Sequence, residues 1–304
     1  MDVAITGSSG LIGSALGRRL EQDGHRVIRM VRRPVRPGES AIRWDPAAGH
    51  LDPVDLEGVT AVVNLAGAGI GDKRWSPERK REILESRTVS TALLATTLAG
   101  LERRPDVLVS GSAIGFYGDR GDETLTEESG PGDDFLAEIC TAWEAETRPA
   151  TDAGIRVATI RTGIVLSAEG GALPKMLPLF KLGVGGRYGS GRQWWSWITL
   201  DDEVSAICHL LDHDISGPVD VTAPEPVTNA AFAKALGKAL HRPAALPVPA
   251  FGPKLVVGGE LAQALLFTSA RVLPTVLEAS GFAFAHPDLE GALRAVLANP
   301  ARST

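Results

Sequence analysis

The sequence predicts an α/β fold, in which a doubly wound parallel sheet of the Rossmann type is followed by a smaller C-terminal lobe. Short β-branched runs alternate with longer segments of helical periodicity over the first half of the chain, which is the pattern of βαβ units. Three glycines follow the first apolar run directly, and the composition shifts to glycine and proline after residue 165. We therefore expect a nucleotide-binding domain at 1–165 and a substrate-side lobe at 166–304.

The first 165 residues contain five predicted strands, at 3–6, 25–31, 60–66, 106–112 and 154–161. Helices are expected between them, at 10–22, 77–99 and 133–153. Gly24 and Gly100 follow the first two helices, where a left-handed residue commonly ends a helix. Right-handed crossovers between parallel strands then give a doubly wound sheet. In the second part we expect mixed elements, a later strand that could return to the sheet, and a helical segment at about 254–298.

Composition and charge exclude several classes of protein. The formal net charge of the 304 residues is −6, whereas proteins that bind nucleic acid usually carry a basic face. No apolar run is long enough to span a bilayer, and the first strand begins too early to leave room for a signal peptide. The two cysteines, Cys140 and Cys208, lack metal-ligand spacing and are expected to be buried, inert thiols of a cytoplasmic protein.

The three glycines form the pattern G-x-x-G-x-x-G, with Gly7, Gly10 and Gly13 between a strand and a helix. In such a bend, glycine permits a tight turn and a close approach of the backbone to a pyrophosphate. The N-terminus of the following helix supplies amide donors and the positive end of a dipole. Because strand, bend, helix and next strand follow in the right order, we predict a dinucleotide site rather than a purely structural turn. Its residues are Gly7, Ser8, Ser9, Gly10, Leu11 and Ile12.

Two arginines, Arg32 and Arg33, follow the second predicted strand. A carboxylate at this place would bond the ribose 2′-hydroxyl of NAD(H), whereas an arginine accommodates a 2′-phosphate. The pair therefore predicts NADP(H). The alternative is that both arginines belong to a solvated loop.

The stretch "NLAG" at 64–67 ends the third predicted strand at the carboxyl edge of the sheet, where open α/β folds bind ligands. Small residues there, including Gly67, let the adenosine side of a cofactor lie close to the backbone. An ordinary strand exit is the alternative, but several strand ends converge on the same groove.

Motifs along most of the chain resemble the extended short-chain dehydrogenase/reductase superfamily, in its NAD(P)-dependent epimerase/dehydratase group. They are "TGSSGLIG", "NLAG", "SGSAIGFYG", "RTGIVL" and "GSGRQWWSWITLDD". The segments "RWSPERKREILESR" and "ARVLPTVLEASGFAFAHPDL" resemble an atypical subgroup of that superfamily, the "epimerase family" proteins. The resemblance implies NADP binding, a homodimer formed through the predicted helices at 77–99 and 133–153, and cofactor contacts at Arg32, Leu65, Ala66, Glu82, Arg87 and Val165.

The chemistry of the superfamily normally needs a serine or threonine, then a tyrosine and a lysine four residues apart on one helix. The lysine lowers the pKa of the tyrosine so that the phenol can act as acid or base. Ser112 matches the serine, but the alignment places Leu136 at the tyrosine and Cys140 at the lysine. Leucine has no proton to give, and a thiol does not replace an ammonium group.

Two residues are candidates for the missing acid. Tyr117 lies just beyond the strand that carries Ser112, where its phenol could overhang the nicotinamide; the alternative is a wall residue with a satisfied hydroxyl. Ser112 could orient a carbonyl or merely cap a turn. A further departure is Trp195, which stands where nucleotide-sugar enzymes of the superfamily carry a diphosphate-binding arginine, although Arg187 or Arg192 could supply charge from another direction.

The aromatic group "WWSW" at 194–197 is expected to have a mixed role, with one ring lining the substrate pocket and the others packing between the lobes. The six histidines are scattered, and the pair His209 and His213 has no third ligand beside it, so we expect no metal site.

Two functions follow from these residues and the resemblance. The first is an NADP-dependent oxidoreductase or epimerase-like enzyme acting on a small carbonyl or hydroxyl substrate. The second is a regulatory protein that senses NADP(H) without turning it over. An intact pocket favours the first function, and the loss of the tyrosine and lysine favours the second.

Overall fold

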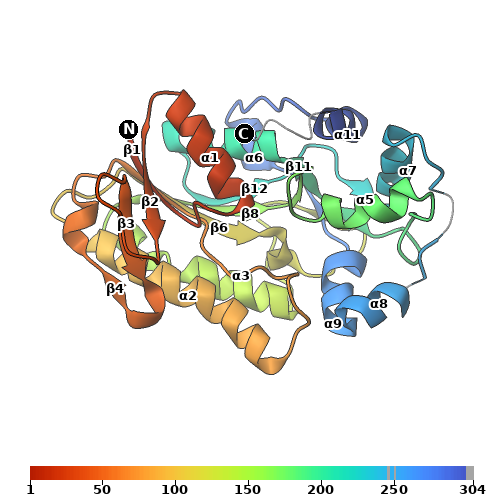
Figure 1. The fold of residues 1–304 in the computed structure, drawn as a ribbon, viewed down its shortest axis with the longest axis horizontal. Coiled ribbons are helices and arrows are strands. Elements are labelled where there is room, and N and C mark those ends of the chain that lie inside the picture. The colour runs from red at the N-terminus through yellow and green to blue at the C-terminus, as the bar shows by residue number, and fades with distance from the viewer. Residues whose placement is uncertain (245–246, 250, 299–304) are drawn as a thin grey trace.

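The computed structural model describes residues 1–244, 247–249 and 251–298, and within them a sheet of eight strands forms the centre of the molecule (Figure 1). The strands lie in the order β12-β8-β6-β5-β1-β2-β3-β4. All neighbours are parallel except β3 and β4. Their bounds are β1 Asp2–Thr6, β2 Arg26–Val31, β3 Ala41–Asp45, β4 His50–Leu51, β5 Ala61–Asn64, β6 Val107–Ala113, β8 Arg156–Thr162 and β12 Gly217–Val221.

Helices cover both faces of this sheet. The helices α1 (Leu11–Gln22) and α6 (Leu200–Asp212) pack on one face, and α2 (Pro77–Ala99), α3 (Phe135–Ala145) and α4 (Arg148–Asp152) lie on the other (Figure 1). Alternating side chains of the buried strands serve the two layers: within β1, Val3 and Ile5 join the core under α1 and α6, while Ala4 joins the core under α2. The predicted doubly wound α/β fold is confirmed.

The strand order reverses between β1 and β5. From β1 the chain continues through β2 and β3 in one direction, and from β5 through β6, β8 and β12 in the other. Helices leave these two strands on opposite faces, which opens a crevice at their carboxyl ends. Thr6 and Asn64, the last residues of β1 and β5, lie side by side in the sheet at this point. The candidate site is therefore expected here.

A third core cluster forms at the other end of the molecule, where α5 (Leu173–Lys181), α7 (Asn229–Ala239) and α11 (Leu289–Ala298) lie (Figure 1), and it includes Trp195 and Trp197. Three short strand pairs lie outside the large sheet: β7 with β14, β9 with β11, and β10 with β13. The bounds of these strands and of the remaining helices are β7 Thr124–Leu125, β9 Ile164–Leu166, α5 Leu173–Lys181, β10 Trp194–Trp195, β11 Trp197–Thr199, β13 Val227–Thr228, α7 Asn229–Ala239, α8 Phe251–Val257, α9 Gly259–Ala262, β14 Arg271–Val272, α10 Thr275–Ala279 and α11 Leu289–Ala298.

The predicted helix at 133–153 is wrong as a single element, because it is divided into α3 and α4. Pro149 has no N–H to donate to the carbonyl of Ala145, so the α-helical hydrogen-bond ladder cannot continue through this point. The hydroxyl of Thr147 instead donates to the carbonyl of Glu144 at 2.7 Å.

The expected helical segment at about 254–298 is also interrupted. Strand β14 and the short helix α10 divide it, and Gly258 and Gly281 adopt φ angles of 100° and 80° that break helical geometry. Strands β3 and β4 were not predicted. Of the two expected left-handed ends, Gly24 has a φ of 83° and fits, whereas Gly100 has a φ of −85° and does not.

Candidate functional site

The glycine bend packs so tightly that only glycine fits at two of its positions. A Cβ on Gly7, whose φ is 64°, would lie 2.5 Å from the carbonyl oxygen of Leu65, and one on Gly13 would lie 2.3 Å from the carbonyl oxygen of Gly7. Gly10 is the N-cap of α1 and provides no side-chain hydrogen bond, whereas Ser76 and Asp134 cap α2 and α3. The first-turn amides of α1 are therefore available to an anion.

The floor of this crevice is a buried polar network. The hydroxyl of Thr6 donates to the side-chain oxygen of Asn64 at 2.7 Å and accepts the backbone N–H groups of Leu65 and Ala66 at 3.0 and 3.1 Å. The Asn64 amide in turn donates to Thr91 at 2.8 Å. These bonds hold the first two residues after β5 against the glycine bend. Thr6 and Asn64 were not predicted to be positioning residues, because their partners lie far away along the chain.

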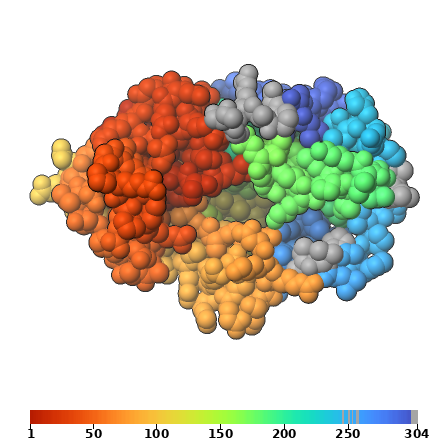
Figure 2. Space-filling view, in the orientation of Figure 1, coloured from red at the N-terminus to blue at the C-terminus, as the bar shows by residue number. Residues whose placement is uncertain are grey.

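Leu11, Ile12, Leu65 and Val165 pack against one hydrophobic core cluster, so the structure brings these predicted contact residues together. The loop after β9 also meets α1: a Cβ on Gly170 would touch the Leu11 side chain at 3.4 Å. Figure 2 shows the surface hollowed where the N-terminal segment (red), the α2 segment (orange) and the α5 segment (green) meet.

The two arginines after β2 differ in their surroundings. The guanidinium of Arg33 binds both carboxylate oxygens of Glu39, which raises the pKa of Arg33 and lowers the pKa of Glu39 to about 2. Arg32 is exposed, and its side chain has no hydrogen bond or ion pair within residues 1–244, 247–249 and 251–298. Of the two arginines directly after β2, Arg32 is thus the one whose charge has no partner among the described residues.

The helix α2 places two further predicted residues beside the crevice. Arg87 is buried against Gly67, and a Cβ added at Gly67 would lie 3.1 Å from the guanidinium carbon of Arg87. The guanidinium donates to the carbonyl of Ala68 at 3.0 Å. Glu82 lies on the outer face of α2, where its exposed carboxylate pairs with Arg79 at 2.6 Å. Arg79 bonds the carbonyl of Gly69, so Glu82 is linked to the loop after β5 only through Arg79.

Ser112 lies at the end of β6 and is 5% exposed. Its hydroxyl donates to the Glu144 carboxylate at 2.6 Å. Glu144 also accepts two hydrogen bonds from the guanidinium of Arg161, each 2.9 Å long. This bidentate ion pair fixes the carboxylate, and through it the hydroxyl of Ser112.

Tyr117 is fully buried. Its hydroxyl donates to the Asp220 carboxylate at 2.7 Å and accepts from Arg161 at 3.0 Å. Burial and the nearby Asp220 raise the pKa of the Tyr117 phenol, so its proton is held more tightly than in water. The geometry favours the packing role of Tyr117 over the role of general acid.

The helix α3 presents Leu136 and Cys140 toward the short turn after β6: a Cβ on Gly115 would lie 3.1 Å from the Leu136 side chain and 3.9 Å from the Cys140 sulfur. These two residues thus border the turn that follows Ser112. Burial raises the pKa of the Cys140 thiol to about 12 and that of the Cys208 thiol to about 11, so both side chains are uncharged.

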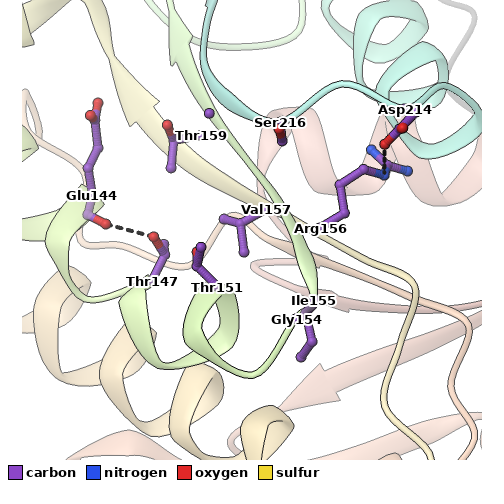
Figure 3. Close-up of a pocket in the computed structure, with 11 residues that line it drawn as sticks. Glu144, Thr147, Thr151, Gly154, Ile155, Arg156, Val157, Thr159, Asp214 and Ser216 are labelled. Carbon is purple, nitrogen blue, oxygen red and sulfur yellow. Dashed lines mark hydrogen bonds and ion pairs between the residues drawn. The ribbon is translucent and has the colours of Figure 1, made fainter.

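A cavity of about 530 Å³ runs along β8 beside α3 and α4, and Figure 3 shows the residues that line it. The pair Arg156 and Asp214, 3.8 Å apart, lies at one end of this cavity. Glu144 lies at the other end, with its carboxyl group pointing away from that pair. The cavity therefore extends from the Arg156–Asp214 pair to Glu144 on α3.

Two rings of the aromatic group at 194–197, those of Trp195 and Trp197, belong to the third core cluster, whereas the half-buried Trp194 donates to Asp122 at 2.9 Å. Trp195 is 4% exposed and packs on Phe232 and Tyr188, with ring centroids 5.1 and 6.0 Å away, and Trp197 donates to the carbonyl of Glu225. Among the described residues, no three His, Cys, Asp or Glu side chains are placed to share a metal ion. Across the same residues, none of the helices combines the length and apolar character needed to cross a bilayer.

A family model described as the NAD dependent epimerase/dehydratase family matches residues 3–222, which include the glycine bend, Ser112 and Asp220. The chain belongs to this family. The resemblance found in the sequence is thereby confirmed. Residues 248–296 match a second model, described as a domain of unknown function.

Relatives of this epimerase/dehydratase chain match it over nearly its whole length. It is 44% identical over 292 residues to the epimerase family protein Mb2239 of Mycobacterium bovis, covering 96% of each chain. It is 35% identical over 302 residues to the human epimerase family protein SDR39U1, covering 98% of this chain and 100% of the human one.

Among solved structures, human SDR39U1 (isoform 2) with NADPH matches with a TM-score of 0.89 and 34% identity, covering 98% of this chain and 100% of that one. The UDP-glucose 4-epimerase of Thermus thermophilus, in complex with NAD, matches with a TM-score of 0.75. Its identity is 19% over the full length of both chains, so this second likeness shows the fold alone.

Proposed function

We propose that the protein binds NADP(H) and is an oxidoreductase or epimerase-like enzyme that acts on a small carbonyl or hydroxyl substrate. The observation that carries the proposal is the uncapped N-terminus of α1 behind a bend where only glycine fits at Gly7 and Gly13. The human relative, of which 34% of the sequence is identical, is solved with NADPH, which supports the choice of dinucleotide.

The residues of the crevice fit such a group. The first-turn amides of α1 would hold the pyrophosphate, and Arg32, which is exposed and lacks a protein partner among the described residues, would hold the 2′-phosphate. Arg33 is bound to Glu39 and so would shape the loop rather than bind phosphate itself. When bound, the nicotinamide supplies hydride transfer; the chain supplies binding and orientation.

The Ser112 oxygen would orient the reacting group by accepting a hydrogen bond from it. Its proton is directed to Glu144, so its remaining lone pairs suit a donor such as a substrate hydroxyl or a carboxamide N–H. Tyr117 would keep its packing role, because its hydroxyl is buried and shared between Asp220 and Arg161. The proton for the substrate would then come from water or from the substrate itself.

The second candidate is an NADP(H)-sensing regulatory protein without turnover. It is favoured by Leu136 and Cys140, neither of which can act as acid or fixed cation, and by the burial of Tyr117. Fluorescence titration of the full chain with NADPH and NADH tests binding, and a panel of carbonyl compounds added to the NADPH complex tests turnover. Oxidation of NADPH supports the enzyme. Tight binding without oxidation across the panel supports the sensor, and no uptake of either dinucleotide overturns both.

A further inference from the structure

Two buried N–H donors beside the third core cluster have no acceptor among the described residues: Nε1 of Trp195 and Nδ2 of Asn229. The two residues are 4% and 1% exposed. Leaving a buried donor unpaired is costly, so such atoms normally mark the place of a bound acceptor. Four other tryptophans show the usual state, in which the indole N–H donates to an oxygen of the protein: Trp75, Trp143, Trp194 and Trp197.

The two donors are neighbours in space. Trp195 pairs with Val227 across the ladder of β10 and β13, and Asn229 follows Val227 by two residues. The side-chain oxygen of Asn229 accepts the backbone N–H of Tyr188 at 2.6 Å, and the ring centroids of Tyr188 and Trp195 are 6.0 Å apart. Because an oxygen must face the Tyr188 N–H, the other end of the Asn229 amide carries the free N–H groups. The Asn229 amide and the Trp195 indole therefore both lie beside Tyr188.

Aromatic rings surround this place. The ring centroid of Phe232 is 5.1 Å from that of Trp195, and that of Phe267 is 6.4 Å from that of Tyr188. Within the described chain, no charged side chain bonds to either free donor. A charged ligand atom would lose its hydration here without gaining a counter-charge. An uncharged acceptor, such as a carbonyl oxygen, suits two N–H donors among aromatic rings.

A row of side chains leads from the donors toward the crevice. Tyr188 is 7% exposed, and Phe267, which packs on it, is half-buried. Leu265 belongs to the same helical turn, η4 (Gln263–Phe267), and is 40% exposed. A Cβ on Gly71, in the loop after β5, would lie 3.4 Å from the Leu265 side chain. Exposure thus rises from the two donors to the loop that borders the crevice.

We propose that Trp195 and Asn229 bind a carbonyl oxygen of an uncharged, largely apolar substrate, whose remainder lies along Tyr188 and Phe267 toward the crevice. The inference rests on the proposed function and narrows its substrate to molecules that carry no phosphate or carboxylate at this end. The free N–H groups of both side chains are donors only, so they anchor the substrate and leave proton transfer to other groups.

The experiment follows the indole N–H signal of Trp195 by NMR in the full chain, prepared with ¹⁵N-labelled tryptophan and with NADP⁺ present. Trp195→Phe identifies this signal by its loss. We expect the uncharged ketones acetophenone and benzophenone to shift the signal downfield, because the N–H gains an acceptor. UDP-glucose, whose diphosphate is charged, is expected to leave it unchanged.

Two variants separate ligand binding from packing. Trp195→Phe is expected to weaken acetophenone binding about tenfold, measured by ligand-observed NMR, because one of two hydrogen bonds is lost. Its melting temperature is expected to stay at or above that of the wild type, since no hydrogen bond within the protein is removed. Trp197→Phe is the matched control: Trp197 is fully buried in the same cluster and already donates to the carbonyl of Glu225 at 3.0 Å. It should lower the melting temperature and keep the acetophenone affinity.

The possible outcomes are distinct. If neither ketone shifts the Trp195 signal, the inference is wrong and NADP(H) binding stands; a cross-peak between this N–H and water in the same spectra would then identify an internal water as the acceptor. If Trp195→Phe and Trp197→Phe weaken ketone binding equally, Trp195 only packs and the inference is overturned. If the ketones bind as expected but neither NADPH nor NADH does, the proposed function fails while the carbonyl site stands.

Discussion

Ser112 donates its hydroxyl hydrogen to Glu144 at 2.6 Å, and this bond joins the end of β6 to the helix α3. The carboxylate is held by Arg161, whose side chain is 5% exposed. In a reaction, Ser112 would have to break this charge-assisted bond before it could give a proton to a carbonyl. The pair is therefore built to hold the Ser112 oxygen in place as an acceptor.

The first prediction concerns this network. Glu144→Gln removes the counter-charge of the buried Arg161, and we expect it to lower the free energy of unfolding by about 3–5 kcal/mol, measured by urea denaturation. Ser112→Ala, which removes only the neutral partner, is the control and is expected to cost about 1–2 kcal/mol. Equal losses in the two variants would contradict the central role of the Arg161 ion pair.

The second prediction tests Tyr117. Tyr117→Phe removes the hydroxyl that donates to Asp220, whose pKa is already raised to about 8, chiefly by burial and by Glu127. We expect the variant to lose about 1–3 kcal/mol of stability and to keep its NADPH affinity and any turnover at 20 °C, as followed by nicotinamide fluorescence. A folded variant with normal NADPH binding and abolished turnover would show that Tyr117 is the acid after all.

The parts of the fold and of the site that could be predicted are those marked by a short pattern of neighbouring residues in the sequence. The glycine bend is one, since Gly7, Gly10 and Gly13 lie within one short stretch of the chain and Gly13 packs on the carbonyl oxygen of Gly7. The bond between Thr6 and Asn64 spans 58 residues, and the network from Ser112 to Arg161 joins a strand, a helix and a second strand. No short pattern marks such partners.

The same limit explains the elements that were placed wrongly. The helix predicted at 133–153 has the right periodicity on both sides of its break, and the break depends on the single missing N–H of Pro149. Strand β3 is short, and it becomes a strand because the exposed edge of β2 pairs with it. Likewise, the two arginines after β2 look alike in the sequence, and nothing near them indicates that Glu39 binds the guanidinium of Arg33.

The third prediction separates these two arginines. We expect Arg32→Ala to weaken NADPH binding about tenfold or more and to leave NADH binding nearly unchanged, because only NADPH carries the 2′-phosphate. Arg33→Ala is the matched control, with a smaller effect, since Arg33 is already bound to Glu39. Fluorescence titration of both dinucleotides at about 0.05 and 0.5 M salt measures the contrast, which should shrink at high salt. A larger loss in Arg33→Ala would reverse the assignment.

The fourth prediction concerns Glu203, which is fully buried in the first turn of α6 and which no step of the proposed function uses. One carboxyl oxygen accepts from Thr162 at 2.8 Å, and the other has no hydrogen-bond partner in the described chain. Burial raises the pKa of Glu203 to about 8. The folded protein therefore keeps this proton at pH values where the unfolded chain, with a pKa near 4.5, releases it.

It follows that the contribution of Glu203 to stability is complete below pH 4.5 and is lost as the pH rises toward 8. Glu203→Gln cannot lose a proton, so we expect it to match the wild type near pH 5 and to exceed its stability at pH 8.5 by up to about 4 kcal/mol. Thermal unfolding across this range measures the difference. Asp201→Asn, at an exposed position in the same helical turn, should retain the pH profile of the wild type. A constant difference between Glu203→Gln and the wild type at every pH would mean that Glu203 does not titrate in this window.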